Sequence, residues 1–302
     1  GSNKYLIVKL ERLFKRSLFL IRLCTIPALN FAPQKKTFFF IFLLLIIVYG
    51  TINTKIFNYS IIMKKLLILG SEGYLGTVLV PFLSKNNYEI VGVDQCFFGK
   101  KNKNSKKIKI IKKNYINLKK DFLEKFDYVI DLVNISNDPA SELNRKFTYK
   151  VNYLNKLNLY KKLSKSKNLK RYVYMSSCSV YGNNKNLITE KSLPKPISLY
   201  SKLCLKYEKY LKLKKKIPFS ILRLGTLYGW SKRMRYDVAI NKIIRDMIFL
   251  KKVEVLGGNQ LRFFCYNKFA CKIIDSIIKD STNRYKNKIL NIGVFNTNII
   301  KL

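Results

Sequence analysis

The chain has 302 residues, of which 48% are hydrophobic, so it can form one large domain or two modest ones with a sizeable core. It carries 59 Lys and Arg residues against 17 Asp and Glu residues, and it has no His, which excludes mechanisms that need an imidazole base or ligand. The net charge of +42 would suit nucleic acid or an anionic membrane. However, the lysines are spread over nearly every segment, so we favour a coding bias and expect no specific nucleic-acid partner.

The six cysteines stand at positions 24, 96, 178, 204, 265 and 271 and form no C-x-x-C pair. Disulfide frameworks and zinc sites have more regular spacings, so this arrangement favours a reduced protein. We therefore expect a cytoplasmic protein without a metal site.

Residues 1–62 differ in pattern from the rest of the chain. No Met precedes Met63, and the apolar run Phe38–Tyr49 follows two lysines. The run is shorter than the about 20 apolar residues that span a bilayer, although a signal anchor with positive flanks is an alternative. We expect the natural protein to begin at Met63 and regard 1–62 as an extension of doubtful origin. Membrane contact is expected only if residues 38–49 are native.

The stretch Met63–Gly76, MKKLLILGSEGYLG, predicts a strand, a glycine-rich turn and the start of a helix. Leu66–Leu69 is typical of a buried strand, and a helical pattern runs from Thr77 to about Ser84. Strand, glycine turn and helix in this order form the context of a dinucleotide-binding site.

The three glycines have different physical tasks in such a turn. Gly70 permits a tight turn, Gly73 lets a pyrophosphate approach the backbone, and Gly76 lets the helix pack closely against the strand. The helix N-terminus adds N–H donors and a partial positive charge. We therefore expect cofactor contacts from Gly70, Gly73, Tyr74, Leu75 and Gly76.

Asp94 supports this interpretation, because it ends the next predicted strand, Glu89–Val93. A carboxylate about twenty residues past the glycines can accept hydrogen bonds from a ribose 2′-hydroxyl. It would repel a 2′-phosphate, so Asp94 favours NAD over NADP.

The segments that follow alternate between strands and helices. Strands are predicted at 108–111, 127–133, 171–175 and 219–224, and helices at 147–163 and 199–214. This alternation predicts an α/β fold with a parallel sheet, doubly wound with helices on both faces. Asn134 begins a turn at a strand end, where ligands of such sheets bind. Beyond Gly229 we expect a helix at 238–250, a strand at 253–256 and a helix at 268–279, which could form a small cap over the sheet.

Two hydroxyl groups are placed to carry chemistry. Ser177 ends the fifth strand, and Tyr200 opens the next long helix, so both would face the ligand crevice. A phenol with a pKa of about 10 is a poor base at neutral pH unless a nearby cation stabilises the phenolate. One helical turn further on, at the position that would supply this cation, the chain has Cys204.

Five separated motifs occur in an order that resembles the extended short-chain dehydrogenase/reductase family, in particular its NAD-dependent sugar-nucleotide epimerases and dehydratases. They are the glycine motif, Asp94, Tyr174–Gly182 (YMSSCSVYG), the Tyr200 helix with Glu208, and Leu222–Gly229 (LRLGTLYG). The resemblance spans about 63–292. It implies a Rossmann domain at 63–229 that binds NAD, and a lobe at 230–302 that binds a nucleotide-sugar and is incomplete.

The resemblance also implies roles for individual residues. Ser177 matches the family's catalytic Ser or Thr, Tyr200 its catalytic Tyr, and Asn152 an Asn near the active site. The family's Tyr-x-x-x-Lys pattern has Cys204 in place of its Lys, which also removes a donor to the nicotinamide ribose. We therefore expect NAD binding with slow turnover, and a faster rate for Cys204→Lys. The pair Tyr210 and Lys214 also fits the pattern, but it lies about three turns further along the helix.

Four polar residues beyond Tyr228 could contact a nucleotide-sugar pyrophosphate: Arg235, Asp237, Asn241 and Arg262. Surface roles for them are equally open. The resemblance implies an enzyme that transiently oxidises a sugar hydroxyl, and Cys178 and Ser179 beside Ser177 favour an epimerase or reductase over a dehydratase. The alternatives are an NAD-binding sensor or scaffold without catalysis, and a nucleic-acid binder. A homodimer is also implied by the resemblance.

Overall fold

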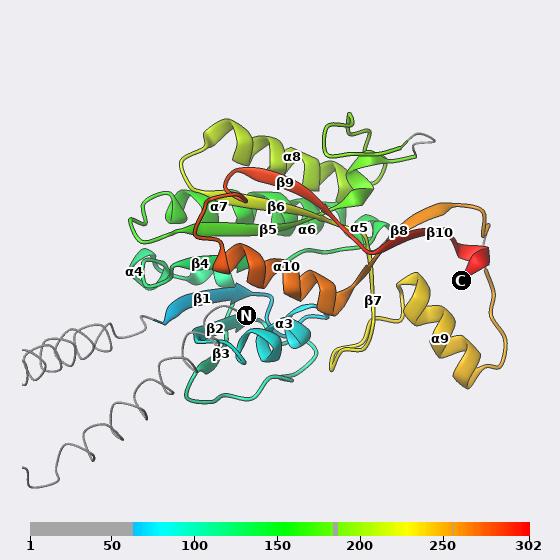
Figure 1. The fold of residues 1–302 in the computed structure, drawn as a ribbon, viewed down its shortest axis with the longest axis horizontal. Helices are drawn as coiled ribbons and strands as arrows, with labels where there is room; N and C mark the ends of the chain where they lie inside the picture. The colour runs from blue at the N-terminus through cyan, green and yellow to red at the C-terminus, as the bar shows by residue number, and fades with distance from the viewer. Residues whose placement is uncertain (1–62, 184–186, 256) are drawn as a thin grey trace, which may run out of the picture. The chain divides into compact units, whose positions relative to one another are not determined.

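A seven-stranded parallel sheet carries the fold, in the strand order β3-β2-β1-β4-β5-β6-β9 (Figure 1). The computed structural model describes residues 63–183, 187–255 and 257–302, so our expectations for 1–62 lie outside the described residues. The strands are β1 (Lys64–Leu69), β2 (Tyr88–Asp94), β3 (Ile108–Lys112), β4 (Tyr128–Asp131), β5 (Arg171–Ser177), β6 (Phe219–Leu224) and β9 (Lys288–Ile292). Strand order reverses between β1 and β4, as in a doubly wound sheet, so the predicted fold class is confirmed.

Helices cover both faces of this sheet. The described helices of this part are α3 (Gly76–Leu83), α4 (Lys120–Leu123), α5 (Asp138–Leu143), α6 (Arg145–Tyr149), α7 (Asn155–Leu163), α8 (Leu199–Lys214) and α10 (Asn267–Lys279). A further helix, α9 (Ala239–Phe249), lies apart from this sheet, in the C-terminal part of the chain (Figure 1). Successive side chains of a strand point to opposite faces of the sheet, so they pack into two different hydrophobic cores. Leu66 packs with α3 and α10, whereas Leu67 packs with α7 and α8, and both are fully buried. The near-continuous apolar strands therefore follow from burial on two sides.

The helix that the sequence predicts at 147–163 has an irregular centre. Helix α6 is followed by a π-helical turn, Lys150–Leu154, before α7 begins. Such turns widen one helical loop and often occur at functional sites. Asn152 lies inside this turn and is fully buried.

A smaller sheet lies in the C-terminal part of the chain. It joins β7 (Thr226–Tyr228), β8 (Leu261–Tyr266) and β10 (Phe295–Asn298) in the order β10-β8-β7. The strand predicted at 253–256 is wrong, because residues 253–255 have no strand and residue 256 is outside the described ones. Gly257 and Gly258 follow with φ of +80° and +87°, so the backbone turns where a strand would continue. The large sheet takes its last strand, β9, from beyond residue 230.

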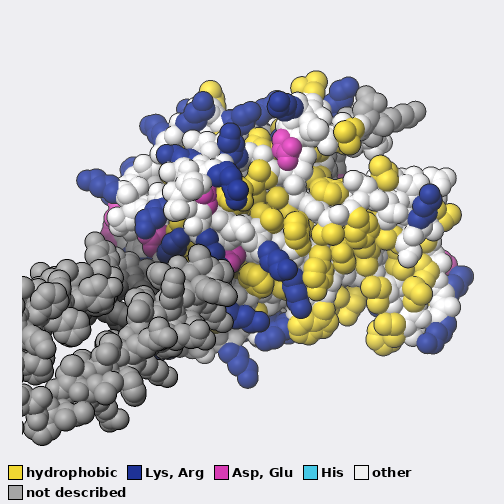
Figure 2. Space-filling model, viewed as in Figure 1, with side chains coloured by type: hydrophobic (Ala, Val, Ile, Leu, Met, Phe, Trp, Pro, Cys, Tyr) yellow, Lys and Arg dark blue, Asp and Glu magenta, His cyan; other side chains and the backbone are white. Residues whose placement is uncertain are grey.

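The second sheet and α9 carry much of the exposed apolar surface (Figure 2). Exposed large side chains of α9 are Ile244, Met247, Ile248 and Phe249. Lysine and arginine side chains are scattered over the visible face in Figure 2 and form no single stripe. Among the described helices, none combines the length and hydropathy that crossing a bilayer requires.

Candidate active site

The glycine turn connects β1 to α3 at the carboxyl edge of the sheet. Gly70 has φ of +80°, a conformation that side chains disfavour, so this position requires glycine. A Cβ on Gly76 would collide with the carbonyl oxygens of Gly70 and Ser71, the latter at 2.5 Å. A Cβ on Gly73 would meet only the Gly70 carbonyl oxygen, at 3.3 Å. Gly76 thus serves the packing of the turn, whereas Gly73 leaves open space beside it.

This turn fits the phosphates of a dinucleotide. The backbone N–H groups of Tyr74 and Leu75 have no acceptor among the described residues, although both residues are buried. They stand at the start of α3, where the helix dipole favours negative charge. A pyrophosphate could bind here, because the turn has free N–H donors, the positive end of the helix dipole, and no side chain at Gly73.

Asp94 lies beside the turn because β2 pairs in parallel with β1. The Gly70 N–H donates to the Val93 carbonyl at 2.9 Å, so Asp94 follows directly at the edge. Its Oδ2 accepts from the Glu72 N–H at 3.0 Å and its Oδ1 from the Cys96 N–H at 2.7 Å. Each oxygen keeps a lone pair for a further donor, so the carboxylate can still accept ribose hydroxyls.

Glu72, inside the glycine motif, is a structural residue that the sequence analysis did not single out. Its buried carboxylate accepts from the Asn102 N–H at 3.1 Å, from the Asn102 side chain at 2.9 Å and from the Lys101 N–H. The Asn102 side chain also donates to the Ser71 carbonyl at 2.9 Å. These bonds fix the loop after Asp94 against the glycine turn. A carboxylate between two glycines was the signal for it.

The loop after β4 holds the two predicted asparagines. Asn134 donates to the Met175 carbonyl at 3.1 Å, and its buried Oδ1 has no partner among the described residues. Asn152 accepts from the Ile135 N–H at 2.8 Å and donates to the Ile135 carbonyl at 3.0 Å. Asn152 therefore shapes the loop through both of its polar atoms, whereas the Asn134 side chain keeps one unpaired, buried acceptor.

Ser177 and Tyr200 come together from different elements. Ser177 ends β5, and its Oγ accepts from the Ser179 N–H at 3.1 Å, while Tyr200 is the second residue of α8. Burial raises the pKa of Tyr200 well above its ordinary value, and the Cys204 thiol acts in the same direction. Hydrogen bonding to Ser177 and the charge of Arg235 act against this rise. The side chains of Ser177 and Tyr200 thus lie together at the carboxyl edge of the sheet.

Cys204 lies one turn below Tyr200 and is completely buried. Burial raises the pKa of its thiol to about 12, although the phenols of Tyr174 and Tyr200 and the charge of Lys156 oppose the rise. The thiol is therefore neutral at physiological pH and supplies no charge to Tyr200. The other predicted pair, Tyr210 and Lys214, lies elsewhere, since Tyr210 packs edge-on against the Tyr160 ring at the far side of the helix.

A buried ion pair beneath the site went unpredicted. Lys156 Nζ donates to Asp131 Oδ2 at 2.7 Å and to the Val133 carbonyl at 2.6 Å, and both charged side chains are fully buried. The Tyr172 hydroxyl donates to the same Asp131 oxygen at 2.6 Å. Lys156 also lies 5.1 Å from the centre of the Tyr174 ring. In the sequence, the feature that indicates this pair is Asp131 itself, because an acidic residue inside an apolar strand needs a buried partner.

The segment Gly229–Asn241 lies across the glycine turn. The Tyr74 hydroxyl donates to the Gly229 carbonyl at 2.6 Å and accepts from Asn241 at 3.1 Å. Ser231 bonds with the Thr77 hydroxyl at 2.6 Å and donates to the Tyr74 carbonyl at 2.8 Å. The Asn241 side chain thus has its hydrogen-bond partners within the protein, and Tyr74 joins the glycine turn to the segment Gly229–Asn241.

Arg235 and Asp237 of the same segment reach the β4 loop. Arg235 donates to Ser136 Oγ at 2.8 Å and to Asp237 Oδ1 at 3.0 Å, and Asp237 accepts from Asn137 at 2.8 Å. Burial would raise the pKa of Asp237, but the bonds from Arg235 and Asn137 outweigh it and lower the pKa to about 2. Arg262 is separate from this group, exposed on β8.

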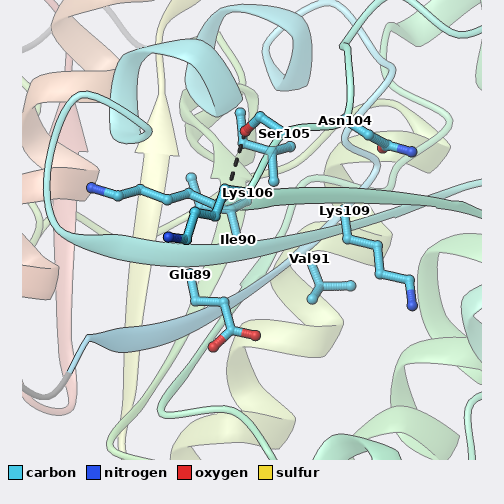
Figure 3. A pocket seen from close by; sticks show the side chains of 9 residues that line it. Glu89, Ile90, Val91, Asn104, Ser105, Lys106 and Lys109 are labelled. Atoms are coloured by element: carbon cyan, nitrogen blue, oxygen red, sulfur yellow. Dashed lines mark hydrogen bonds between the residues drawn. The ribbon is translucent and has the colours of Figure 1, made fainter.

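A pocket of about 400 Å³ lies elsewhere, between β2, β3 and the loop before β3 (Figure 3). It is lined by Glu89, Ile90 and Val91 at the start of β2, together with residues 104–109. Asp94 ends the same strand, so this pocket is at the opposite end of β2 from the glycine turn. It contains none of the predicted site residues.

Known proteins match this chain over most of its described residues. It is 27% identical over 230 residues to an uncharacterised UDP-glucose epimerase, YtcB, of Bacillus subtilis strain 168. This alignment covers 71% of this chain and 72% of the relative. A solved UDP-glucuronic acid 4-epimerase from Bacillus cereus, in complex with UDP-glucuronic acid and NAD, aligns with a TM-score of 0.69 at 25% identity, covering 78% of this chain and 80% of that one.

A UDP-N-acetylglucosamine 4-epimerase from Methanobrevibacter ruminantium M1 shares the fold, with a TM-score of 0.71 at 23% identity, over 79% of each chain. Residues 66–293 match the sequence profile of the NAD dependent epimerase/dehydratase family. That range contains every motif on which the resemblance was based, and NAD is the cofactor of this family. The chain therefore belongs to the NAD-dependent epimerase/dehydratase family, the nucleotide-sugar branch of the extended short-chain dehydrogenases/reductases.

Proposed function

We propose that this protein acts on a nucleotide-sugar by transient oxidation of a sugar hydroxyl, as an epimerase or a related enzyme. The observation that carries the proposal is the meeting of Ser177 and Tyr200 at the same sheet edge as the glycine turn. When bound, NAD supplies the acceptor for the hydride and returns it later. The phosphates would rest on the N–H groups at Gly73–Leu75, and Asp94 would hold the adenosine ribose.

The side chains have distinct tasks in this scheme. Ser177 would hold the sugar oxygen by a hydrogen bond, and the Tyr200 phenolate would accept the proton of the sugar hydroxyl. The same proton returns to the sugar oxygen when the hydride returns, so the chain ends unchanged. Neutral, buried Cys204 gives the phenolate no charge, which supports slow turnover.

Substrate contacts are proposed for the second lobe. Arg262 is exposed, and a guanidinium suits bidentate contact with a pyrophosphate. Arg235, Asp237 and Asn241 have protein partners, so they would contact substrate only by exchanging some of these bonds. YtcB is named as a UDP-glucose epimerase, and the Bacillus cereus enzyme was solved with UDP-glucuronic acid, which makes UDP-glucose and UDP-glucuronic acid the first substrates to test.

Two measurements test the function. Calorimetry with NAD should show binding, and it should be weaker for NADP because Asp94 would repel a 2′-phosphate. Incubation with NAD and each UDP-sugar should produce an epimerised sugar, detected by chromatography after hydrolysis, and a transient rise in reduced-nicotinamide absorbance. Tyr200→Phe is the control that should abolish both signals while leaving NAD affinity unchanged. NAD binding without any change in the sugars would contradict the enzymatic proposal.

An NAD-binding sensor or scaffold is the second candidate function, favoured by the uncharged Cys204. It predicts tight NAD binding, no reduced nicotinamide with any UDP-sugar, and no effect of Tyr200→Phe. We also propose a homodimer, as the family resemblance implies, and a cytoplasmic location, which the cysteine pattern favours. Light scattering of the purified protein tests the dimer.

A further inference from the structure

Arg233 carries a positive charge that no carboxylate balances in the part of the chain that the structure describes. Its guanidinium carbon lies 3.7 Å from the centre of the Phe98 ring, and one of its N–H groups donates to the Met234 carbonyl at 2.7 Å. A guanidinium stacked over an aromatic ring is attracted by the π electrons. The contact joins two segments that lie far apart in the sequence, the loop after β2 and the segment Gly229–Asn241.

The loop that contains Phe98 is fixed to the first half of the glycine turn. It begins at Asp94, whose Oδ2 accepts from the Glu72 N–H at 3.0 Å. It returns at Asn102, whose backbone N–H donates to the Glu72 carboxylate at 3.1 Å and whose side chain donates to the Ser71 carbonyl at 2.9 Å. Phe98 stands between these two anchors and is 64% exposed, although one face of its ring packs on the guanidinium. The loop, and not burial, therefore holds the ring in place.

Arg233 is fixed to the second half of the same turn. Its backbone N–H donates to Ser231 Oγ at 3.2 Å, and the Ser231 hydroxyl donates to the Tyr74 carbonyl at 2.8 Å. The Ser231 and Thr77 hydroxyls also lie 2.6 Å apart, which connects the segment to the first turn of α3. The stack of Arg233 on Phe98 therefore closes a ring of contacts, which runs from the glycine turn through the loop after β2 and back through Ser231.

The groups that would hold the adenosine half of NAD are part of this ring. The N–H groups of Tyr74 and Leu75, which lack an acceptor among the described residues, belong to the turn, and Asp94 begins the loop. The guanidinium that closes the ring adds a positive charge, which opposes the departure of an anion such as a pyrophosphate. Both stacked side chains stand on exposed segments, so their contact can break and form again without unfolding the sheet.

We propose that the contact between Phe98 and Arg233 is a clasp that keeps NAD bound, so that NAD is released only when the two side chains separate. The clasp acts on the cofactor of the family and does not need the sugar chemistry of the proposed function. It suits that chemistry as well, because the hydride accepted by NAD has to be returned before NAD leaves. A contact between exposed side chains is weak, so its loss should speed release about two- to fivefold.

The test measures the release of NADH from the full chain, because NADH has the same adenosine half as NAD and is fluorescent. Protein loaded with NADH is mixed with an excess of NAD, and the fluorescence decay gives the rate constant of release. Phe98→Ala and Arg233→Gln should each release NADH about two- to fivefold faster than the wild type. Phe97→Ala is the matched control and should release NADH at the wild-type rate. Phe97 is 75% exposed in the same loop, and it contacts no cation or aromatic ring among the described residues.

The double variant Phe98→Ala with Arg233→Gln distinguishes one shared contact from two independent effects. Because both substitutions remove the same contact, the double variant should release NADH no faster than the faster of the two single variants. Release rates that multiply would show that the two side chains act separately, and they would overturn the clasp.

Two other results would also overturn the inference. One is release of NADH at the wild-type rate from both single variants, even if the urea midpoint of the NAD-free protein falls, since the stack would then serve the fold alone. The other is equally fast release from Phe97→Ala, which would assign the effect to the loop as a whole. The rates are measured without a sugar, so failure to epimerise any UDP-sugar would count against the proposed function and leave the result for the clasp unchanged.

Discussion

Substitution to alanine should have different effects at two glycines of the turn: at Gly73 it should lower the affinity for NAD, and at Gly76 it should lower the stability of the fold. A Cβ on Gly73 meets only one backbone atom, the Gly70 carbonyl oxygen at 3.3 Å, and Gly73 is not in a left-handed conformation. Replacing glycine by alanine at a compatible backbone conformation stabilises a fold by about 0.4–1 kcal/mol through the unfolded chain. The tight contact offsets part of this, so the stability of Gly73→Ala should be close to that of the wild type.

The affinity for NAD should nevertheless fall in Gly73→Ala. The new methyl group would occupy the space through which a phosphate reaches the N–H groups of Tyr74 and Leu75. A hydrogen bond to a charged group contributes about 1.5–3 kcal/mol. Losing one such bond corresponds to a roughly 10- to 150-fold weaker dissociation constant.

Gly76→Ala tests the other half of the argument. Its Cβ would collide with two backbone carbonyl oxygens, which have no room to move away. Overpacking of this kind costs about 1–3 kcal/mol or more, so the urea midpoint should fall markedly. Calorimetry with NAD and urea denaturation are measured on both variants. A Gly73→Ala protein that binds NAD as tightly as the wild type would refute the placement of the pyrophosphate on this turn.

Three further predictions concern the charged groups of the site. Cys204→Lys should raise the rate of NAD reduction by UDP-sugars, and equal rates for the two proteins would contradict the missing-cation argument. Lys156→Met should destabilise the fold by about 3–5 kcal/mol in urea denaturation because it leaves Asp131 buried without its cation, whereas Lys156→Met with Asp131→Leu should recover much of the loss. Asp94→Asn should weaken NAD binding about tenfold, from one lost charge-assisted bond, and narrow the preference for NAD over NADP; unchanged affinities for both would exclude a ribose contact.

The sequence was informative wherever local pattern determines structure. Buried strands such as Leu66–Leu69 are recognisable because parallel strands with helices on both faces are apolar throughout. The glycine motif is equally local, since Gly70 and Gly76 are required by backbone conformation and by carbonyl groups a few residues away. These features made the fold class and the glycine turn between β1 and α3 predictable.

The unpredicted features depend on contacts between distant segments. Strands β8 and β10 have exposed residues at their ends and no clear alternation, so their pairing depends on neighbours rather than on pattern. The Lys156–Asp131 pair joins an interior lysine to a strand carboxylate 25 residues earlier. The strand predicted at 253–256 does not form, because the glycines at 257 and 258, both with positive φ, turn the backbone directly after a segment whose local pattern suits a strand.

The segment Gly229–Asn241 links the two halves of the candidate site. Through Tyr74 it contacts the cofactor turn, and through Arg235 it contacts the loop that anchors the helix of Tyr200. Under the proposed function, a sugar nucleotide that exchanged bonds with Arg235 or Asn241 would therefore change the surroundings of both the glycine turn and Tyr200. Proton transfer at Tyr200 would then depend on substrate being seated, which suits an oxidation that has to be reversed on the same molecule before release.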